Sequence, residues 1–406
     1  MRLFRSFMMG GFECSTHTLR SGRRLDLVSS TRHDVFARED YERMQAIGMR
    51  TARDGVRWHV AEPTPGQYDF SSVTPMIQAA LETGTQVIWD LLHFGWPDHI
   101  DPLSEWFPDR FADFVKGFAD VLRREGDTSP AVCPVNEISF LSFAGGQLGF
   151  FNPWVHDRGD DLKRQLVRAS IAAGRVMREA FPSVRLVHSD PIINVASWPE
   201  RPGDRAAAEN HRRAQFHAWE MLGGFACPEL GGSPEHLDVL GVNYYVHNQW
   251  YFPGGHGSTI SPSSPAYRPL RELLIDTYER FHRPMFIAET GIEDEARPLW
   301  LAYVGAEARA AMRAGVALEG ICLYPIVNHP GWEDDRHCYN GLWDYADASG
   351  GREPYGPLLA EIERQNELFR QFDADPSFVE DTKPALQVLD SIARSIAEAT
   401  ESSREA

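Results

Sequence analysis

The sequence predicts a single (β/α)8 barrel, a TIM barrel of the α/β class, followed by a C-terminal helical appendage. Short apolar runs of strand length alternate with longer helical patterns eight times along the chain. This rhythm is typical of a (β/α)8 barrel rather than of a doubly wound sheet. Most of the short runs are continuously apolar, as expected for parallel strands that are buried on both faces. A length of 406 residues suits one large α/β barrel.

Eight strands are predicted from these apolar runs. They lie at residues 3–10, 49–56, 86–92, 131–136, 184–189, 237–245, 285–289 and 320–326. No internal repeat is visible beyond the alternation of strands and helices.

Eight helices are predicted from apolar residues at helical spacing. The helix that begins near Pro108 places Phe111 and Phe114 on one stripe, and the first two helices stop at Gly48 and Gly84. The predicted helices are residues 38–47, 72–83, 108–124, 160–181, 204–222, 269–281, 298–314 and 357–372.

The barrel is predicted to comprise residues 1–372, and residues 373–406 form the appendage. Within the appendage, residues 383–399 carry apolar side chains on one helical face, which predicts a last helix. The final residues are polar and are expected to fray. We find no linker that would divide the chain into two independent domains.

The composition argues against several classes of partner. A net charge of −18 disfavours nucleic acid and anionic membranes, because both need a basic surface. No apolar stretch has the length of a signal-peptide core or a membrane span, so we expect a cytoplasmic protein. The five cysteines do not form a disulfide framework, and Cys133 and Cys322, inside strand-like runs, are expected to be buried thiols.

No cofactor is predicted. The sequence contains no HExxH, no paired CxxC, no Walker loop and no GxGxxG, the patterns that would indicate a metal, a phosphate loop or a dinucleotide. The oligomeric state cannot be predicted from the sequence.

Two of the predicted strands end in a glutamate. Glu137 follows the fourth strand and Glu289 ends the seventh, and each passes directly into a loop. The active site of a barrel lies at the C-terminal ends of its strands, so both carboxyl groups are expected in one pocket. Paired carboxylates in one pocket are the groups that cleave glycosidic bonds.

Polar side chains at neighbouring strand ends are expected to support this pair. A fixed arginine and a tyrosine hydroxyl favour the charged form of a carboxylate, as a nucleophile requires. Apolar neighbours such as Ile138 and Phe140 keep the proton on Glu137 longer, as a general acid requires. The supporting candidates are Arg53, His93, Asn136 and Tyr245.

Tryptophans gather in segments that follow strands. Aromatic rings match the flat faces of sugar rings, so these residues are expected to line a binding cleft, although long loops also use aromatic residues for their own small cores. A long loop, residues 246–268, is either a flexible surface loop or a lid over the site. The tryptophans are Trp96, Trp106, Trp154, Trp198, Trp250 and Trp332.

Several of these segments carry the motifs of a known family, in its order and spacing, over roughly residues 7–345. The chain resembles glycoside hydrolase family 1, the β-glucosidase family, within the larger clan A of retaining (β/α)8 glycosidases. The matching segments are Arg53-Asp-Gly-Val-Arg-Trp58, Asp90-Leu-Leu-His93-Phe-Gly-Trp-Pro97, Val135-Asn136-Glu137, Leu240-Gly-Val-Asn243-Tyr-Tyr245, Ile287-Ala-Glu289-Thr-Gly291 and Asn340-Gly-Leu342.

The resemblance implies a role for each matched residue. It implies that Glu289 attacks the anomeric carbon and that Glu137 first protonates the leaving oxygen and then deprotonates the incoming water. Arg53 and Tyr245 are implied to orient Glu289 and to keep it charged.

The glycone-binding residues match only in part. Asn136 and His93 are implied to bind sugar hydroxyls. Thr16-His17 stands where the family has a glutamine, and Tyr324 stands where it has a tryptophan platform. Gly331 takes the place of the usual glutamate, with Trp332 and Glu333 following it. The sugar is therefore expected to meet a different set of partners, which include His17, Tyr324, Trp332 and Glu333.

The function predicted from the sequence is retaining hydrolysis of a small-molecule or oligosaccharide β-glycoside, through a covalent glycosyl–enzyme intermediate. Two alternatives stay open. One is a transglycosidase that uses a sugar or alcohol acceptor, and the other is a carbohydrate-binding barrel without catalysis. The sequence does not identify the glycone or the aglycone, nor does it separate exo from endo action.

Overall fold

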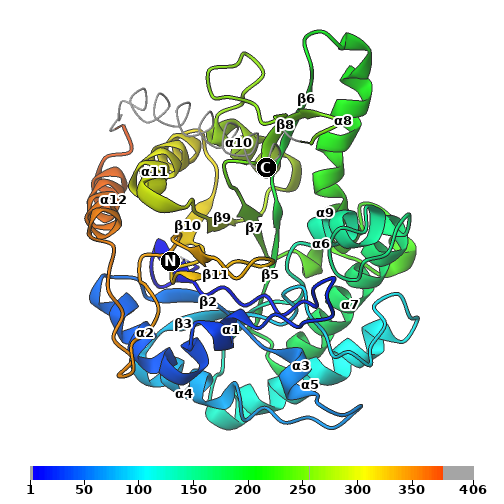
Figure 1. Cartoon of the computed structure of the whole chain (residues 1–406), viewed down its shortest axis with the longest axis vertical. Helices are drawn as coiled ribbons and strands as arrows, with labels where there is room; N and C mark the ends of the chain where they lie inside the picture. The colour runs from blue at the N-terminus through cyan, green and yellow to red at the C-terminus, as the bar shows by residue number, and fades with distance from the viewer. Residues whose placement is uncertain (1–2, 256, 378–406) are drawn as a thin grey trace.

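The computed structural model describes residues 3–255 and 257–377. Eight parallel strands close into a barrel in the order β1, β10, β9, β7, β5, β4, β3 and β2, with helices around it (Figure 1). The predicted (β/α)8 fold is therefore confirmed. The barrel strands are β1 (Met8–Gly11), β2 (Thr51–Gly55), β3 (Gln86–Asp90), β4 (Ala131–Cys133), β5 (Arg185–Pro191), β7 (Val239–Asn243), β9 (Met285–Thr290) and β10 (Leu318–Leu323).

The main helices of the outer layer overlap the eight predicted ones. The predicted helix 204–222 is broken by a 3-10 turn, η3 (Ala214–Phe216), because Gln215 donates from Nε2 to the carbonyl of Arg212 at 2.5 Å and binds the backbone of Ile193. The main helices are α2 (His33–Ala46), α4 (Thr74–Thr83), α5 (Phe107–Glu125), α7 (Gly159–Ala180), α8 (Arg205–Arg213), α9 (His217–Leu222), α10 (Leu270–Phe281), α11 (Arg297–Arg313) and α12 (Gly356–Ala374). The predicted helix 383–399 lies outside the described residues.

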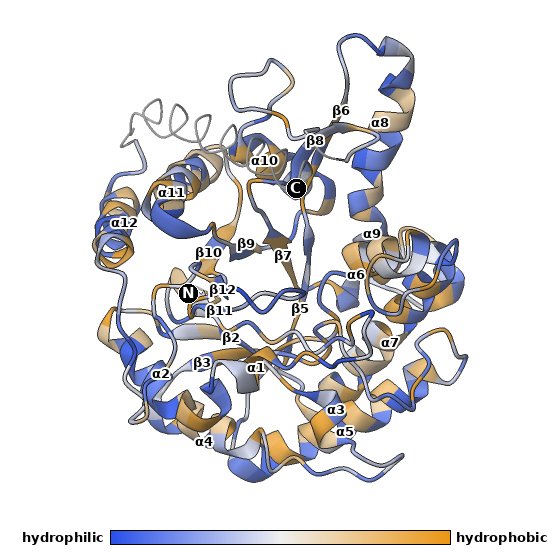
Figure 2. Cartoon of the chain, in the orientation of Figure 1, coloured by the Kyte–Doolittle hydropathy of each residue, from blue (hydrophilic) through white to orange (hydrophobic). Residues whose placement is uncertain are grey.

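Apolar side chains fill both the barrel and the layer between strands and helices. The ribbons of the outer helices carry both hydrophobic and hydrophilic residues (Figure 2). The interior set includes Cys133 and Cys322, which are buried free thiols as predicted. In β2 the interior position belongs to Arg53, which is fully buried and lies beside Ile88 of β3 in the register. A buried guanidinium requires partners, and these form the site described below.

Smaller elements rise beside the mouth of the barrel. Strand β6 (Asn194–Ser197) pairs in parallel with β8 (Gln249–Phe252), and α8 lies next to them (Figure 1). The predicted loop 246–268 thus contains a strand. After β4 come α6 (Ile138–Leu141) and a π-helix, η1 (Ser142–Gln147). These additions extend the walls around the C-terminal strand ends.

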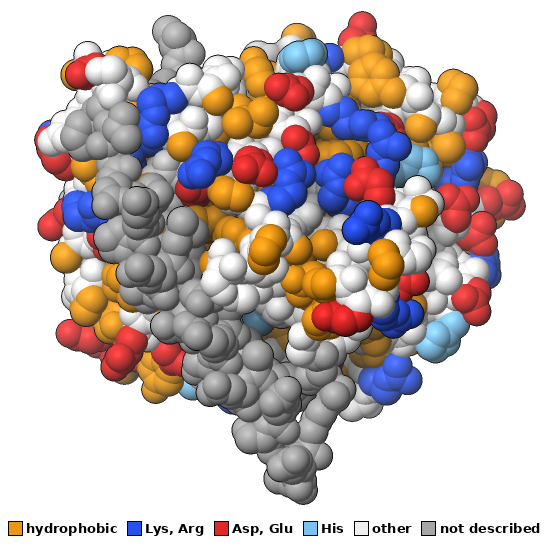
Figure 3. Space-filling view, turned by 90° about the horizontal axis from the view of Figure 1, so that it is seen from above, with side chains coloured by type: hydrophobic (Ala, Val, Ile, Leu, Met, Phe, Trp, Pro, Cys, Tyr) orange, Lys and Arg blue, Asp and Glu red, His pale blue; other side chains and the backbone are white. Residues whose placement is uncertain are grey.

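Within residues 3–255 and 257–377, no helix has the length and apolarity to cross a bilayer. Acidic, basic and hydrophobic side chains alternate over the visible part of the face seen from above (Figure 3).

A buried polar network joins β2 to α2. His33 lies between two carboxylates, 2.8 Å from Asp40 Oδ2 through Nδ1 and 2.7 Å from Asp54 Oδ2 through Nε2. Tyr41 also donates to Asp54, at 2.6 Å, and Arg352 donates to Asp40 at 2.7 Å. Burial alone would lower the pKa of His33, but the two carboxylates raise it to about 9. The imidazolium is therefore part of the folded structure at neutral pH.

This network predicts a loss of stability at alkaline pH. The pKa of His33 rises from 6.5 in the unfolded chain to about 9 in the fold, so its contribution is complete below pH 6.5 and is lost as the pH rises through 9. The shift corresponds to about 3 kcal/mol. We expect Tm to fall between pH 6.5 and 9 in the wild type and to fall less in His33→Gln, as measured by differential scanning calorimetry. His282→Asn, at an exposed position after α10, is the control and should keep the wild-type profile.

Candidate active site

Glu137 and Glu289 face one cavity at the C-terminal mouth of the barrel. Glu289 lies in β9 and Glu137 lies in the loop after β4, and both line a cavity of about 570 Å³. Both side chains are buried. Asn243 pairs with Glu289 in the register of the sheet and donates from Nδ2 to Glu137 Oε1 at 2.7 Å. One side chain thus links the two glutamates.

The backbone of Glu137 adopts an uncommon conformation. Its φ of 51° is left-handed, which a residue with a Cβ rarely adopts and which costs on the order of 1 kcal/mol. The amide of Glu137 donates to the carbonyl of Ser189 at 2.9 Å, and its carbonyl accepts from Leu141 at 2.9 Å. The surrounding loop therefore fixes this carboxyl group, and such strained positions concentrate at functional sites.

Both carboxylate oxygens of Glu289 are held by fixed donors. Arg53 Nη1 donates to Oε1 at 2.9 Å, and the Tyr245 hydroxyl donates to Oε2 at 3.0 Å. The same Nη1 also donates to the carbonyl of Ala288 at 2.9 Å. Charge-assisted bonds of this kind restrict both the rotation and the protonation of a carboxylate.

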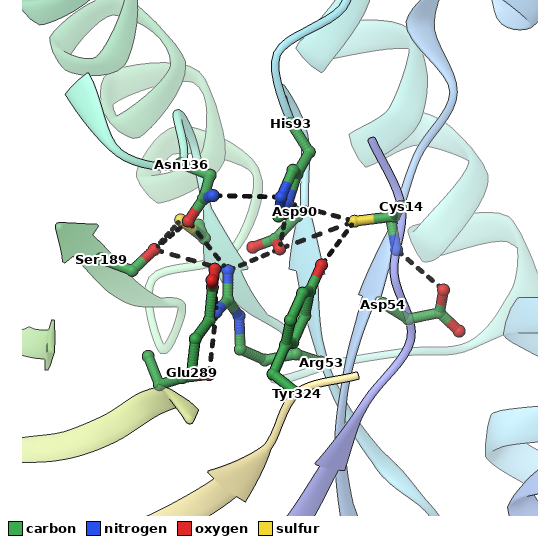
Figure 4. Close-up of polar contacts among 12 residues, drawn as sticks. Cys14, Arg53, Asp54, Asp90, His93, Asn136, Ser189, Glu289 and Tyr324 are labelled. Atoms are coloured by element: carbon green, nitrogen blue, oxygen red, sulfur yellow. Dashed lines mark hydrogen bonds and ion pairs between the residues drawn. The ribbon is translucent and has the colours of Figure 1, made fainter. Parts of the chain in front are cut away.

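Arg53 is itself held from its other side (Figure 4). Its Nη2 donates to Asp90 Oδ2 at 2.6 Å and to Asn136 Oδ1 at 3.1 Å. Asn136 Oδ1 also accepts from the Ser189 hydroxyl at 2.6 Å. Directly or through Arg53, the position of Glu289 thus depends on residues in or just after five other strands, β2, β3, β4, β5 and β7.

Asn136 and His93 lie together beside Arg53 (Figure 4). Asn136 Nδ2 is 3.1 Å from His93 Nε2, and His93 Nδ1 is 3.1 Å from Asp90 Oδ2. An amide nitrogen carries two hydrogens, so Asn136 keeps one for a ligand. The structure thus brings Arg53, His93, Asn136 and Tyr245 together beside the two glutamates, while their roles in binding and catalysis stay predictions.

The two glutamates differ in what sets their pKa values. Burial raises the pKa of Glu137 well above its usual range, and the charge of Glu289 raises it further, against the hydrogen bond from Asn243. Burial also raises the pKa of Glu289, but Arg53 and then His93 oppose that shift. A single proton shared by the pair therefore resides on Glu137, and Glu289 is the ionised member.

A second cavity, of about 940 Å³, adjoins the first on the side of β10. Trp332 lines both cavities, while Tyr324 and Glu333 line only the second. Tyr324 also stacks on His93, with ring centroids 5.9 Å apart. His17 lines neither cavity; it is buried with its ring against Phe151 and Trp332, and its predicted contact with a sugar stays a prediction.

The six tryptophans do not form one cleft. Trp250 and Trp332 line the first cavity. Trp96 is buried in the core, whereas Trp106 is 64% exposed. The other two support the loops that hold them: Trp154 donates to the carbonyl of Thr18 at 3.0 Å, and Trp198 stacks on Tyr251.

Three residues of the site were not among the sequence-predicted candidates. Glu13 follows β1 and lines both cavities, with Oε1 accepting from the Ser15 amide at 2.9 Å. Asp90 ends β3, and Asn243 ends β7. All three obey the rule that already selected Glu137 and Glu289, because each is a polar residue at or just after the end of a barrel strand.

Cys14, Asp90 and His93 offer ligand atoms within 4.8 Å of one another. The donor set does not suit a cation. Asp90 Oδ2 already accepts from Arg53, so a metal would lie beside a guanidinium. Burial raises the pKa of the Cys14 thiol well above its usual range, which keeps it protonated and a poor ligand. Asp90 instead neutralises Arg53, and His93 Nδ1 lies 3.1 Å from the same carboxylate oxygen.

Solved structures of β-glucosidases share the fold of this chain. A β-glucosidase from Thermotoga maritima in complex with glucoimidazole has a TM-score of 0.73 at 15% identity, over 89% of this chain and 98% of its own. A family 1 β-glucosidase from Thermotoga maritima gives 0.72 at 16% identity, over 90% and 98%. The AHE enzyme from Alicyclobacillus herbarius gives 0.72 at 17% identity, over 90% and 100%. Neither a protein-family model nor a curated protein sequence matches the chain.

Proposed function

We propose that this protein is a retaining β-glycoside hydrolase, similar to a β-glucosidase, and that it acts through a covalent glycosyl–enzyme intermediate. The proposal rests on one observation, which is that the two glutamates have different surroundings. Arg53 and Tyr245 hold both oxygens of Glu289, as a nucleophile requires, whereas Glu137 has a raised pKa in the same cavity, as a general acid requires.

In the first step Glu289 attacks the anomeric carbon while Glu137 protonates the glycosidic oxygen. The bond between that carbon and the leaving oxygen breaks, the alcohol departs, and an ester joins the sugar to Glu289. Tyr245 and Arg53 keep the attacking carboxylate ionised and in line until the bond forms. The left-handed backbone of Glu137 holds its carboxyl group in one orientation, so that its proton points toward the glycosidic oxygen.

In the second step the roles of Glu137 reverse. Glu137 has given its proton to the leaving group, and once Glu289 is esterified it carries no charge, so its repulsion no longer adds to the effect of burial and the pKa of Glu137 falls. Glu137 is then ionised and takes a proton from water, which attacks the anomeric carbon and releases Glu289. Two inversions at that carbon restore the β configuration.

The glycone is assigned to the side of the cavity formed by Asn136, His93, Glu13 and Trp332. Asn136 retains one amide hydrogen for a sugar hydroxyl, and Glu13 offers a second carboxylate oxygen. Complexes of the structurally similar β-glucosidase with glucoimidazole and with deoxynojirimycin support a sugar-like ligand. Tyr324 and Glu333 are assigned to the adjoining part of the sugar pocket.

Transglycosylation is the second candidate, and the apolar outer part of the cavity favours it. Phe143 and Trp250 line that part and offer a surface for an acceptor sugar or alcohol. Incubation with a high concentration of acceptor decides between the two, since a hydrolase releases only free sugar. A barrel that merely binds carbohydrate would not need the two fixed donors on Glu289.

Aryl β-glycosides test the proposal. The panel comprises the glycosides of glucose, galactose, mannose, fucose, xylose and glucuronic acid, and proton NMR records the anomer that appears first. We expect turnover of at least one member, with the β anomer of the sugar released first. The α anomer would show inversion, and turnover of none of the panel would contradict hydrolysis of β-glycosides.

A further inference from the structure

The active-site cavity continues from Glu137 away from the barrel axis. This outer part is bounded by elements added after β4, β5 and β7, namely η1, the start of α7, α8 and β8. In the proposed reaction the sugar occupies the inner part, so the group that departs from Glu137 occupies the outer part. The side chains used below are Phe143, Phe150, Lys163, His211 and Trp250.

Aromatic side chains form the opening of this outer part. Phe143 is 39% exposed and Phe150 is 49% exposed, which is unusual for rings of this size. Phe143 packs edge-on against His211, with centroids 5.3 Å apart, and His211 packs edge-on against Trp250 at 5.8 Å. Exposed aromatic faces at a cavity mouth suit a flat apolar ligand.

Lys163 is the one lysine or arginine among the residues that line this cavity, and it lies in the outer part, whereas His93 belongs to the inner part around Glu289. Burial lowers its pKa, against the attraction of Asp190 and Asp160. Throughout the described ranges, no hydrogen bond and no ion pair joins its ammonium group to another residue. Burial and then Lys163 lower the pKa of His211, so that ring adds no positive charge. The ammonium group thus faces the cavity without a direct counter-charge.

Asp190 is near Lys163 but has other partners. The amide of Ser139 donates to both of its oxygens, at 3.0 and 3.1 Å, and burial raises the pKa of Asp190 to about 7. A carboxyl group that is partly protonated at neutral pH and bound to the backbone does not complete an ion pair. The charge of Lys163 therefore remains available to a ligand.

We infer that the outer part of the cavity binds an aromatic leaving group that carries an oxyanion, such as a carboxylate, with Lys163 as its counter-charge. The inference rests on the proposed hydrolysis, because that reaction defines which group leaves. The ring lies among Phe143, Phe150 and Trp250, and the oxyanion meets the ammonium group. This names the substrate class as β-glycosides of anionic phenols.

Two matched substrates test the inference. With the glycone that the aryl panel selects, 4-carboxyphenyl and 4-carbamoylphenyl β-glycosides differ in charge but hardly in size. We expect kcat/KM to favour the carboxylate about tenfold in the wild type, as a charge-assisted contact allows, and the preference to vanish in Lys163→Met. The ratio between the two substrates cancels any effect of the substitution on Glu137 or Glu289.

The control is Lys116→Met, an exposed lysine on α5, which should keep the wild-type ratio. A wild-type ratio near one, or a preference that survives in Lys163→Met, would overturn the inference even though turnover itself is normal. If the 4-sulfophenyl glycoside is also favoured over the 4-carbamoylphenyl glycoside, the site selects for negative charge rather than for a carboxylate in particular.

A binding measurement keeps the inference testable if no glycoside is turned over, which is the outcome that defeats the proposed hydrolysis. Titration calorimetry with 4-hydroxybenzoate and 4-hydroxybenzamide probes the outer cavity without any sugar. We expect the benzoate to bind the wild type more tightly than the amide, and Lys163→Met to bind both alike. Equal affinities in the wild type would contradict the anion site.

Discussion

Replacing Glu289 by alanine is expected to lower kcat on an aryl β-glycoside more than about a thousandfold, because no other carboxylate of the site can form the covalent ester. The expected loss follows from geometry: Arg53 and Tyr245 hold the two oxygens of Glu289 at 2.9 and 3.0 Å, and both donors would be left without their acceptor. Rates before and after the substitution are measured by release of the phenol.

Azide gives this experiment its specificity. A small anion fits the space that alanine leaves and can attack the anomeric carbon from the same side as Glu289. We therefore expect azide to restore turnover and to yield the α-configured glycosyl azide. Glu272→Gln, at an exposed position on α10, is the control and should keep wild-type activity. A fully active Glu289→Ala protein, or a β-configured azide from it, would remove Glu289 from the role of nucleophile.

Arg53 makes a stability control necessary in the same experiment. Its guanidinium is fully buried, and removal of Glu289 takes away one of its two carboxylate partners. Losing one partner of a buried ion pair costs about 3–5 kcal/mol, although Asp90 remains here to limit the effect. Glu289→Gln keeps an oxygen for Arg53, so comparison of Tm and turnover in the alanine and glutamine variants separates lost chemistry from lost stability.

The pattern of apolar runs was sufficient to predict the barrel. Each predicted strand overlaps an observed one because parallel strands are buried on both faces and read as continuous apolar segments. Glu137 and Glu289 were predicted from their place at the ends of two such strands. The predicted helix 204–222 failed to continue through Gln215 because a long-range contact with Ile193 competes with the helix, and periodicity along one segment carries no such information.

The surroundings of the pair were harder to predict. Glu13 satisfies the strand-end rule, but it lies two residues beyond β1 and the sequence of that loop does not indicate that its side chain enters the cavity. Lys163 lies on α7, for which the sequence pattern indicates only an apolar face. Its place in the cavity depends on η1 and β8, which line the opposite side. The misassigned tryptophans make the same point: Trp96 and Trp106 both follow β3, yet one is buried and the other is 64% exposed. Residues on loops depend on tertiary packing that the sequence of the loop does not encode.

Replacing Glu137 by alanine is expected to separate the two chemical steps. With a poor leaving group the first step needs a proton, so kcat/KM should fall by about a hundredfold or more. With 2,4-dinitrophenolate, which departs without protonation, the first step should persist, and slow hydrolysis of the intermediate should produce a burst of phenolate. Stopped-flow absorbance measures the burst, and mass spectrometry of the quenched protein detects the sugar on Glu289.

The pH profile tests the same residue through its proton. In the proposed reaction the active form has Glu137 protonated, so the basic limb of kcat/KM should report its pKa, which burial and Glu289 place well above the usual range of a carboxyl group. With a poor leaving group we expect a basic limb in the wild type. With the dinitrophenyl substrate, whose first step needs no proton, we expect no such limb in either the wild type or Glu137→Gln. An unchanged basic limb would assign that titration to another group.

Azide also discriminates the two glutamates. In Glu137→Ala the intermediate on Glu289 still forms, and azide then attacks from the face that water would use, so the product is the β-configured glycosyl azide. In Glu289→Ala the product is the α-configured one. The two variants must therefore give opposite anomers if Glu289 is the nucleophile and Glu137 the acid and base. The same anomer from both would contradict the assignment, because azide would then attack the anomeric carbon from the same face whichever glutamate is removed.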